Sequence, residues 1–113
     1  MLAKENRINL NKEFDRVFKT GQSFYAKVIG VKTVPTDLKY TRFGILVGLK
    51  VSKKAVIRNK VRRQIRAIIS QELPNLKPGK DVVIIVLPLI LEKNFEEIEK
   101  TLISGFKKLD LYK

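Results

Sequence analysis

The chain begins with a helical pattern of apolar residues. The apolar positions that recur at three- and four-residue spacing are Leu10, Phe14, Val17 and Phe18. Asn11 is a residue type that caps helix N-termini, and Gly21 suits the position just beyond a C-terminus. We therefore expect one short helix that ends before Gly21 and carries two aromatic side chains.

The following segments have the composition of strands. Residues 23–34 (SFYAKVIGVKTV) are rich in β-branched and aromatic residues and end at a turn sequence, and residues 41–48 (TRFGILVG) form a second candidate strand. A short polar loop joins the two segments, so we expect them to pair antiparallel. Residues 81–87 (DVVIIVL) form an apolar run that is typical of a central strand buried on both faces.

Two further helices complete the pattern. A helix over the basic segment at residues 50–66 would have one apolar arc, and the arc continues past residue 66. Its residues are Ile57, Val61, Ile65, Ile68 and Ile69. Near the C-terminus, Asn94 and Glu97 have the spacing of a capping box. The apolar stripe that follows consists of Phe95, Ile98, Leu102, Phe106 and Leu109. The order α-β-β-α-β-α predicts an α+β sandwich, with helices packed on a small mixed sheet in one domain over residues 1–113.

Charge is strongly polarised along the chain. Residues 50–66 (KVSKKAVIRNKVRRQIR) hold eight Lys or Arg and no acid, whereas residues 72–113 hold seven basic and seven acidic side chains. The whole formal net charge of +13 therefore resides in residues 1–71. This asymmetry is the electrostatic footprint expected for a nucleic-acid partner, with an anionic membrane surface as the competing explanation.

The polar arc of the basic segment carries the candidate contacts to nucleic acid. These side chains are Arg58, Asn59, Lys60, Arg62, Arg63 and Arg66. Like charges at this spacing repel by about 0.2–0.5 kcal/mol per pair, so the free protein gains nothing from them. Asn59 offers both a donor and an acceptor to a base edge or a 2′-hydroxyl.

Three lysines, Lys50, Lys53 and Lys54, precede or enter the first turn of the same helix. The N-terminal end of a helix favours anions, so cations there are locally unfavourable. A phosphate bound among these ammonium groups and the free backbone N–H groups would remove that cost.

The composition excludes several chemistries. The chain has no Cys for a disulfide or a thiolate metal site, and no His for general-base or metal-ligand roles. We therefore expect no catalytic residue and no metal ligand in this chain. Neither the N-terminus nor the apolar run at residues 82–91 has the length of a signal or a membrane span, so we expect a cytoplasmic location.

Three functional classes remain from the residues alone. A nucleic-acid-binding subunit explains the segregated charge and the density of Arg, which binds phosphate bidentately. A membrane-surface helix would usually carry aromatic residues on its apolar arc, which is aliphatic here. A stand-alone nuclease needs clustered carboxylates for metal ions, and the basic half has none near its arginines. DNA is not expected, because no helix-turn-helix pairing precedes the basic helix.

Residues 50–66 closely resemble the RNR motif of the protein subunit of bacterial ribonuclease P. The resemblance spans nearly the whole chain. Its other elements are the first-helix residues Phe14, Val17, Phe18 and Gly21, the start of the second strand at Arg42, Phe43 and Gly44, the apolar third strand, and the C-terminal residues Leu111, Tyr112 and Lys113. The α-β-β-α-β-α order agrees with the fold of that family.

The resemblance implies a cofactor of a ribozyme that removes the 5′ leader from precursor tRNA. The cleavage chemistry and its Mg²⁺ ions would reside in the catalytic RNA, and one protein monomer would bind one RNA. The RNA-binding residues would be Arg58, Asn59, Lys60, Arg62, Arg63 and Arg66, with Lys50, Lys53 and Lys54 extending that surface. Phe14, Phe18 and Tyr112 would line a cleft for the single-stranded leader.

The chain departs from the family pattern at two places. Lys60 stands where the family usually has the second Arg of the motif, which keeps the charge but loses the bidentate fork. Gly30 and Lys32 stand at cleft positions where an apolar, often aromatic, side chain is expected, so Lys32 would make an ionic contact to the leader. The sequence leaves open the class of catalytic RNA, the leader preference, holoenzyme dimerisation, and the alternative of a ribosomal-type RNA-binding protein without a processing role.

Overall fold

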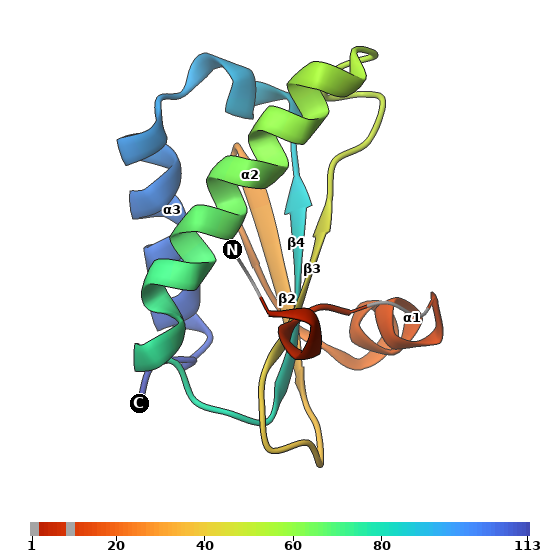
Figure 1. Ribbon diagram of the computed structural model, residues 1–113, viewed down its shortest axis with the longest axis vertical. Helices are drawn as coiled ribbons and strands as arrows, with labels where there is room; N and C mark the ends of the chain where they lie inside the picture. Colours follow the sequence, from red (N-terminus) through yellow and green to blue (C-terminus); the bar gives the residue numbers. More distant parts are fainter. Residues whose placement is uncertain (1–2, 9–10) are drawn as a thin grey trace.

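Helices lie on both sides of one mixed sheet in the computed structural model, which describes residues 3–8 and 11–113 (Figure 1). Helices α2 (Ala55–Glu72) and α3 (Phe95–Lys108) lie on one face of the sheet, and α1 (Asn11–Thr20) lies on the other. The strands are β1 (Gln22–Tyr25), β2 (Ile29–Pro35), β3 (Arg42–Leu46) and β4 (Lys80–Val86). The described residues also form three short 3₁₀ turns: η1 (Lys4–Asn6), η2 (Leu73–Asn75) and η3 (Pro88–Glu92). The predicted α+β class is confirmed.

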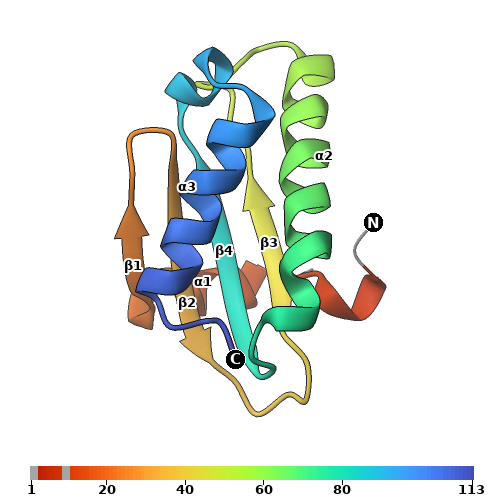
Figure 2. The same ribbon diagram turned by 90° about the vertical axis from the view of Figure 1, so that its left-hand side faces the viewer.

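The strands lie side by side in the order β1-β2-β4-β3 (Figure 2). The last strand in sequence, β4, is central: it pairs antiparallel with β2 and parallel with β3. The predicted central strand is thus confirmed. The predicted antiparallel pair between the first two strand segments is wrong, because β4 lies between β2 and β3.

The predicted single strand over residues 23–34 is also wrong. The segment folds into an antiparallel hairpin of β1 and β2, closed by a hydrogen bond of 2.9 Å from the Ala26 N–H to the Ile29 carbonyl. The turn at residues 26–28 (AKV) contains no Gly, Pro, Asn or Asp, so the usual turn signals are missing. The element order is therefore α-β-β-β-α-β-α, one strand more than predicted.

Two apolar layers hold the helices on the sheet. The larger layer lies under α2 and α3, and it buries four of the five residues predicted for the apolar arc of α2; Ile57 is only half-buried. The predicted capping box of α3 is present, with Asn94 Oδ1 accepting from the Glu97 N–H at 2.9 Å and Glu97 Oε1 accepting from the Asn94 N–H at 3.1 Å. Phe95, predicted in the apolar stripe of α3, is exposed.

The smaller layer lies under α1, where Val17 is fully buried against the sheet. Asn11 is the first helical residue, and Leu10 lies outside the described residues. Gly21 follows the helix as predicted. Its backbone is not left-handed, so close packing, and not conformational freedom, explains why a glycine stands here. A Cβ on Gly21 would lie 2.4 Å from the Val17 carbonyl oxygen and 3.0 Å from that of Thr33 on β2.

An ion-pair network fixes α1 against the strands. Arg42 on β3 donates to both carboxylate oxygens of the buried Asp81 on β4, at 2.8 and 2.6 Å, and its third nitrogen donates to Glu13 on α1. The hydrogen bond to Asp81 is the largest of the effects that together raise the pKa of Arg42 above its ordinary value, so this guanidinium stays charged. The network sets the distance between α1 and the sheet, and with it the shape of the surface described next.

Candidate nucleic-acid interface

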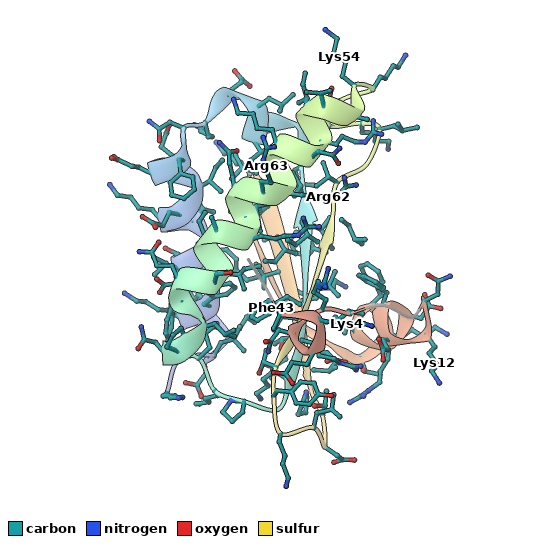
Figure 3. All side chains as sticks on the ribbon, viewed as in Figure 1. Lys4, Lys12, Phe43, Lys54, Arg62 and Arg63 are labelled. Atoms are coloured by element: carbon teal, nitrogen blue, oxygen red, sulfur yellow. The ribbon has the colours of Figure 1, made fainter. Side chains whose placement is uncertain are left out.

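The outward face of α2 is a cationic surface (Figure 3). Figure 3 shows Arg62 and Arg63 projecting from the middle of the helix and Lys54 from its N-terminal end. The exposed residues of the predicted set are Lys50, Lys53, Lys54, Asn59, Lys60 and Arg63, whereas Arg58, Arg62 and Arg66 are half-buried. We call these nine residues the basic face. The structure brings them all to α2 or to the loop directly before it.

Helix α2 starts as predicted, with the three lysines before or at its first turn. It begins at Ala55, so Lys50 and Lys53 lie in the preceding loop and Lys54 is the N-cap, without a side-chain capping bond. The loop is held by Ser52, whose Oγ accepts from the Lys54 N–H at 3.1 Å and whose carbonyl accepts from Arg58 Nη1 at 2.9 Å. No acidic residue lies in the first turn, so the three lysines add their charge to the positive end of the helix dipole.

Two arginines of α2 turn from the basic face toward α1. Arg62 and Arg66 line a pocket of about 230 Å³ whose other walls come from the N-terminal segment, α1 and β3: Arg7, Ile8, Phe14, Phe43, Gly44 and Ile45. Arg62 also donates to Asn59 Oδ1 at 2.8 Å, which leaves the amide N–H groups of Asn59 to act as donors. The pocket joins the basic face to the α1 side of the sheet.

Aromatic side chains of α1 form a second surface beside this pocket. The Phe14 ring covers Gly44 on β3, where an added Cβ would lie 2.3 Å from Phe14 Cε1. Phe18 is 37% exposed, and the Lys32 ammonium on β2 lies 5.8 Å from its ring centroid. We call the surface formed by Phe14, Phe18 and Lys32 the aromatic cleft, after the leader cleft that the resemblance implies. Phe14 also packs against the core, so its role is partly structural.

Tyr112 is not part of the aromatic cleft. It packs on the α2–α3 side of the sheet, with its ring 6.3 Å from that of Phe106 and its hydroxyl donating to Glu72 Oε1 at 2.7 Å. Burial, reinforced by the bond to Glu72, raises the pKa of the Tyr112 hydroxyl above its ordinary value. The structure therefore separates Tyr112 from Phe14 and Phe18, with which the resemblance had grouped it.

Arg7 is a pocket residue that the sequence did not indicate. The Ile8 N–H donates to the Phe43 carbonyl at 2.9 Å, which docks the N-terminal segment beside β3 and brings Arg7 to the pocket. Residues 4–8 show no periodic pattern of apolar positions that would predict their place in the fold. Only the tertiary contact with β3 brings Arg7 to the pocket. Arg7, Arg62 and Arg66 thus line one pocket together with Phe14 of the aromatic cleft.

The side chains of the basic face and the aromatic cleft suit the binding of a single-stranded nucleic acid. Guanidinium and ammonium groups neutralise phosphates, and exposed aromatic faces stack on bases. Over residues 3–8 and 11–113, no three of the Asp and Glu side chains come together as a candidate metal site. The same residues include no helix long and apolar enough to cross a bilayer.

Comparison with known proteins identifies relatives over almost the whole chain. The family model described as Ribonuclease P matches residues 2–110. The ribonuclease P protein component of Synechocystis sp. is 40% identical over 112 residues, covering 95% of this chain and 87% of the relative, and that of Bacillus velezensis is 38% identical, covering 99% and 96%. The structure of the Staphylococcus aureus RNase P protein superimposes with a TM-score of 0.88 at 27% identity, covering 96% of this chain and 98% of that one.

Proposed function

Because the chain belongs to the bacterial ribonuclease P protein family, we propose that its basic face and its aromatic cleft bind two different RNAs. The protein is the cofactor subunit of the endoribonuclease that removes the 5′ leader from precursor tRNA. Family membership decides against the ribosomal-type alternative. The proposal concerns which residues bind the catalytic RNA and which bind the substrate.

The basic face binds the catalytic RNA in this proposal. Its arginines and lysines have no acidic neighbour on α2 before Glu72, so their mutual repulsion is relieved when phosphates bind between them. The loop lysines Lys50, Lys53 and Lys54 add to the positive end of the helix dipole, which favours a phosphate group there. Lys60 neutralises a phosphate as a point charge, where an Arg would add a planar fork.

The aromatic cleft binds the single-stranded leader. Phe18 offers an exposed ring, and Lys32 holds its ammonium group beside that ring, where it can meet the phosphate of a stacked nucleotide. Arg62 and Arg66 line the pocket between the cleft and the basic face, so a leader in the cleft would lie next to the bound catalytic RNA. The observation that carries the proposal is this junction of an exposed aromatic surface with a cationic one.

Catalysis resides in the RNA, and the Mg²⁺ ions that support it are placed there in this proposal. The residues that line the pocket are cationic, aromatic or aliphatic, so the donor set of this chain suits phosphates and bases rather than a divalent cation. The contribution of the protein is to neutralise phosphate repulsion and to hold the leader in place. We further propose one protein monomer per RNA and a cytoplasmic location, where precursor tRNA is made.

The Phe18→Ala variant tests the leader assignment. The holoenzyme with this variant should bind leader-bearing precursor tRNA about fivefold or more weakly, because base stacking on an aromatic ring contributes about 1–3 kcal/mol, while its affinity for mature tRNA stays unchanged. Phe95→Ala is the matched control, since Phe95 is also 37% exposed but lies on α3. Equal losses for precursor and mature tRNA, with a lower melting temperature, would assign Phe18 to the core.

A further inference from the structure

One row of residues crosses all four strands on the α1 side of the sheet. The register pairs Tyr25 on β1 with Gly30 on β2, Gly30 with Ile85 on β4, and Ile85 with Leu46 on β3. Leu46 and Ile85 pack with the α1 layer, whereas the neighbouring positions Val31 and Ile84 belong to the layer under α2 and α3. Strand side chains alternate between faces, so the whole row faces the side that carries the aromatic cleft.

Gly30 creates the place that the Tyr25 ring occupies. A Cβ on Gly30 would lie 2.4 Å from Tyr25 Cε1 and 2.6 Å from Cδ1, so the ring covers the bare backbone of the neighbouring strand. Covering a strand glycine with a cross-strand aromatic ring orders that ring, because it gains a packing surface that other strand residues would block. Tyr25 nevertheless remains 56% exposed, so much of the ring is open to solvent.

Tyr25 lies close to the aromatic cleft. Lys32 is two residues beyond Gly30 on the same strand and therefore on the same face, about 7 Å away along the chain. Its ammonium group lies beside Phe18, as described above. Lys32 thus lies next to Phe18 and two positions along β2 from the glycine that the Tyr25 ring covers.

We propose that Tyr25 is a stacking site for an unpaired base of the 5′ leader, at the β1 edge of the sheet and beyond Phe18. The inference rests on the proposed leader-binding role of the cleft and adds a residue to it. The ring stacks on a base through its open face, and Lys32 meets the phosphate between the nucleotides on Phe18 and on Tyr25. Stacking on an aromatic ring is tolerant of base identity, so this site responds to leader length rather than to sequence.

The test uses the holoenzyme reconstituted with a bacterial ribonuclease P RNA and precursor tRNAs whose leaders increase in length one nucleotide at a time. Tyr25→Ala should leave affinity unchanged for the shortest leaders and lower it about fivefold or more once the leader reaches the β1 edge. Tyr25→Phe should retain the wild-type affinity, because it keeps the ring. Gly30→Ala should reproduce part of the loss, because the new Cβ displaces the ring.

Tyr40→Ala is the matched control. Tyr40 is also an exposed tyrosine, but it lies in the loop between β2 and β3, at the opposite end of β2 from Tyr25. An abasic nucleotide at the responsive leader position should weaken binding to the wild type and have no further effect on Tyr25→Ala, which identifies the base that Tyr25 contacts. That coupling would not arise from a purely structural role.

Two results would overturn the inference. One leaves the proposed leader-binding cleft intact, and the other overturns the cleft as well. If Phe18→Ala loses its preference for leader-bearing substrate while Tyr25→Ala matches the wild type at every length, the Tyr25 site is wrong and the proposed cleft stands. If the wild-type holoenzyme itself shows no dependence on leader length, the leader-binding cleft is wrong and the Tyr25 site falls with it.

Discussion

Arg42 binds Asp81 through two hydrogen bonds, at 2.8 and 2.6 Å, and so joins the parallel strands β3 and β4 at the place where α1 docks. The Asp81 side chain is 1% exposed and Arg42 is 17% exposed. The pair therefore behaves as a buried ion pair, in which the loss of one partner leaves an uncompensated charge.

Arg42→Ala should lower the free energy of unfolding by about 3–5 kcal/mol, because it leaves the Asp81 carboxylate buried without its cation. Urea titration followed by circular dichroism measures this change. Arg63→Ala on the exposed face of α2 is the control and should stay within about 0.5 kcal/mol of the wild type. A loss below about 1 kcal/mol for Arg42→Ala would show that water reaches Asp81 and that the network does not hold α1.

Gly21→Ala should destabilise the protein by more than about 2 kcal/mol, because the new Cβ meets two backbone carbonyls that cannot move independently. Gly48→Ala is the matched control. Gly48 has open space around its Cβ position and no left-handed backbone, so this change should be neutral or stabilise by about 0.4–1 kcal/mol through the unfolded state. Thermal unfolding of both variants is the measurement, and equal stabilities would refute the close-packing account of Gly21.

The stability of the fold should depend on Tyr112 at alkaline pH. The pKa of its hydroxyl is raised in the folded protein, so folding favours the protonated form. The contribution is fully present below the unfolded pKa of about 10 and is lost as pH rises toward the folded value. Tyr112→Phe should remove this part of the decline. If unfolding curves of wild type and variant decline in parallel between about pH 9 and 11, the hydroxyl of Tyr112 is not protected.

Replacing Arg62 and Arg66 with Gln should reduce the salt dependence of binding to the catalytic RNA. Each phosphate contact contributes about 0.7–0.9 to the slope of log affinity against log salt concentration, so the slope should flatten by about 1 to 2 units. The matched control replaces Lys107 and Lys108, which are exposed at the C-terminal end of α3 and outside the basic face, and removes the same charge. Equal slopes for the two double variants would mean that net charge matters and the positions of Arg62 and Arg66 do not.

Local sequence patterns predicted the parts of the fold that depend on local interactions. The capping box at Asn94 and Glu97 and the buried arc of α2 follow directly from residue spacing, and both are confirmed except that Ile57 is half-buried. The β1–β2 hairpin was missed because its turn, residues 26–28, lacks turn residues, and the pairing of β3 was missed because strand order depends on long-range packing. Neither feature leaves a periodic signal in the chain.

The same division applies to the candidate site. The basic face lies on one helix and its preceding loop, so the sequence could group its residues, whereas the pocket depends on tertiary contacts that bring Arg7 and Phe14 beside Arg62. Tyr112 was grouped with the cleft by resemblance, and the contacts to Phe106 and Glu72 place it on the other side of the sheet. Tyr25 was not singled out, because its ring is placed by Gly30 on a neighbouring strand whose pairing the sequence did not reveal.

The most direct test is cleavage of a 5′-extended precursor tRNA at low Mg²⁺ by bacterial ribonuclease P RNAs of both architectural classes, with and without this protein. We expect the protein to stimulate cleavage by at least one RNA and to have no activity alone. Stimulation should fall when the leader is shortened, because the aromatic cleft then has no partner. Cleavage by the protein alone, or binding of both RNAs without stimulation of either, would contradict the assignment of this chain as the leader-binding cofactor of a catalytic RNA.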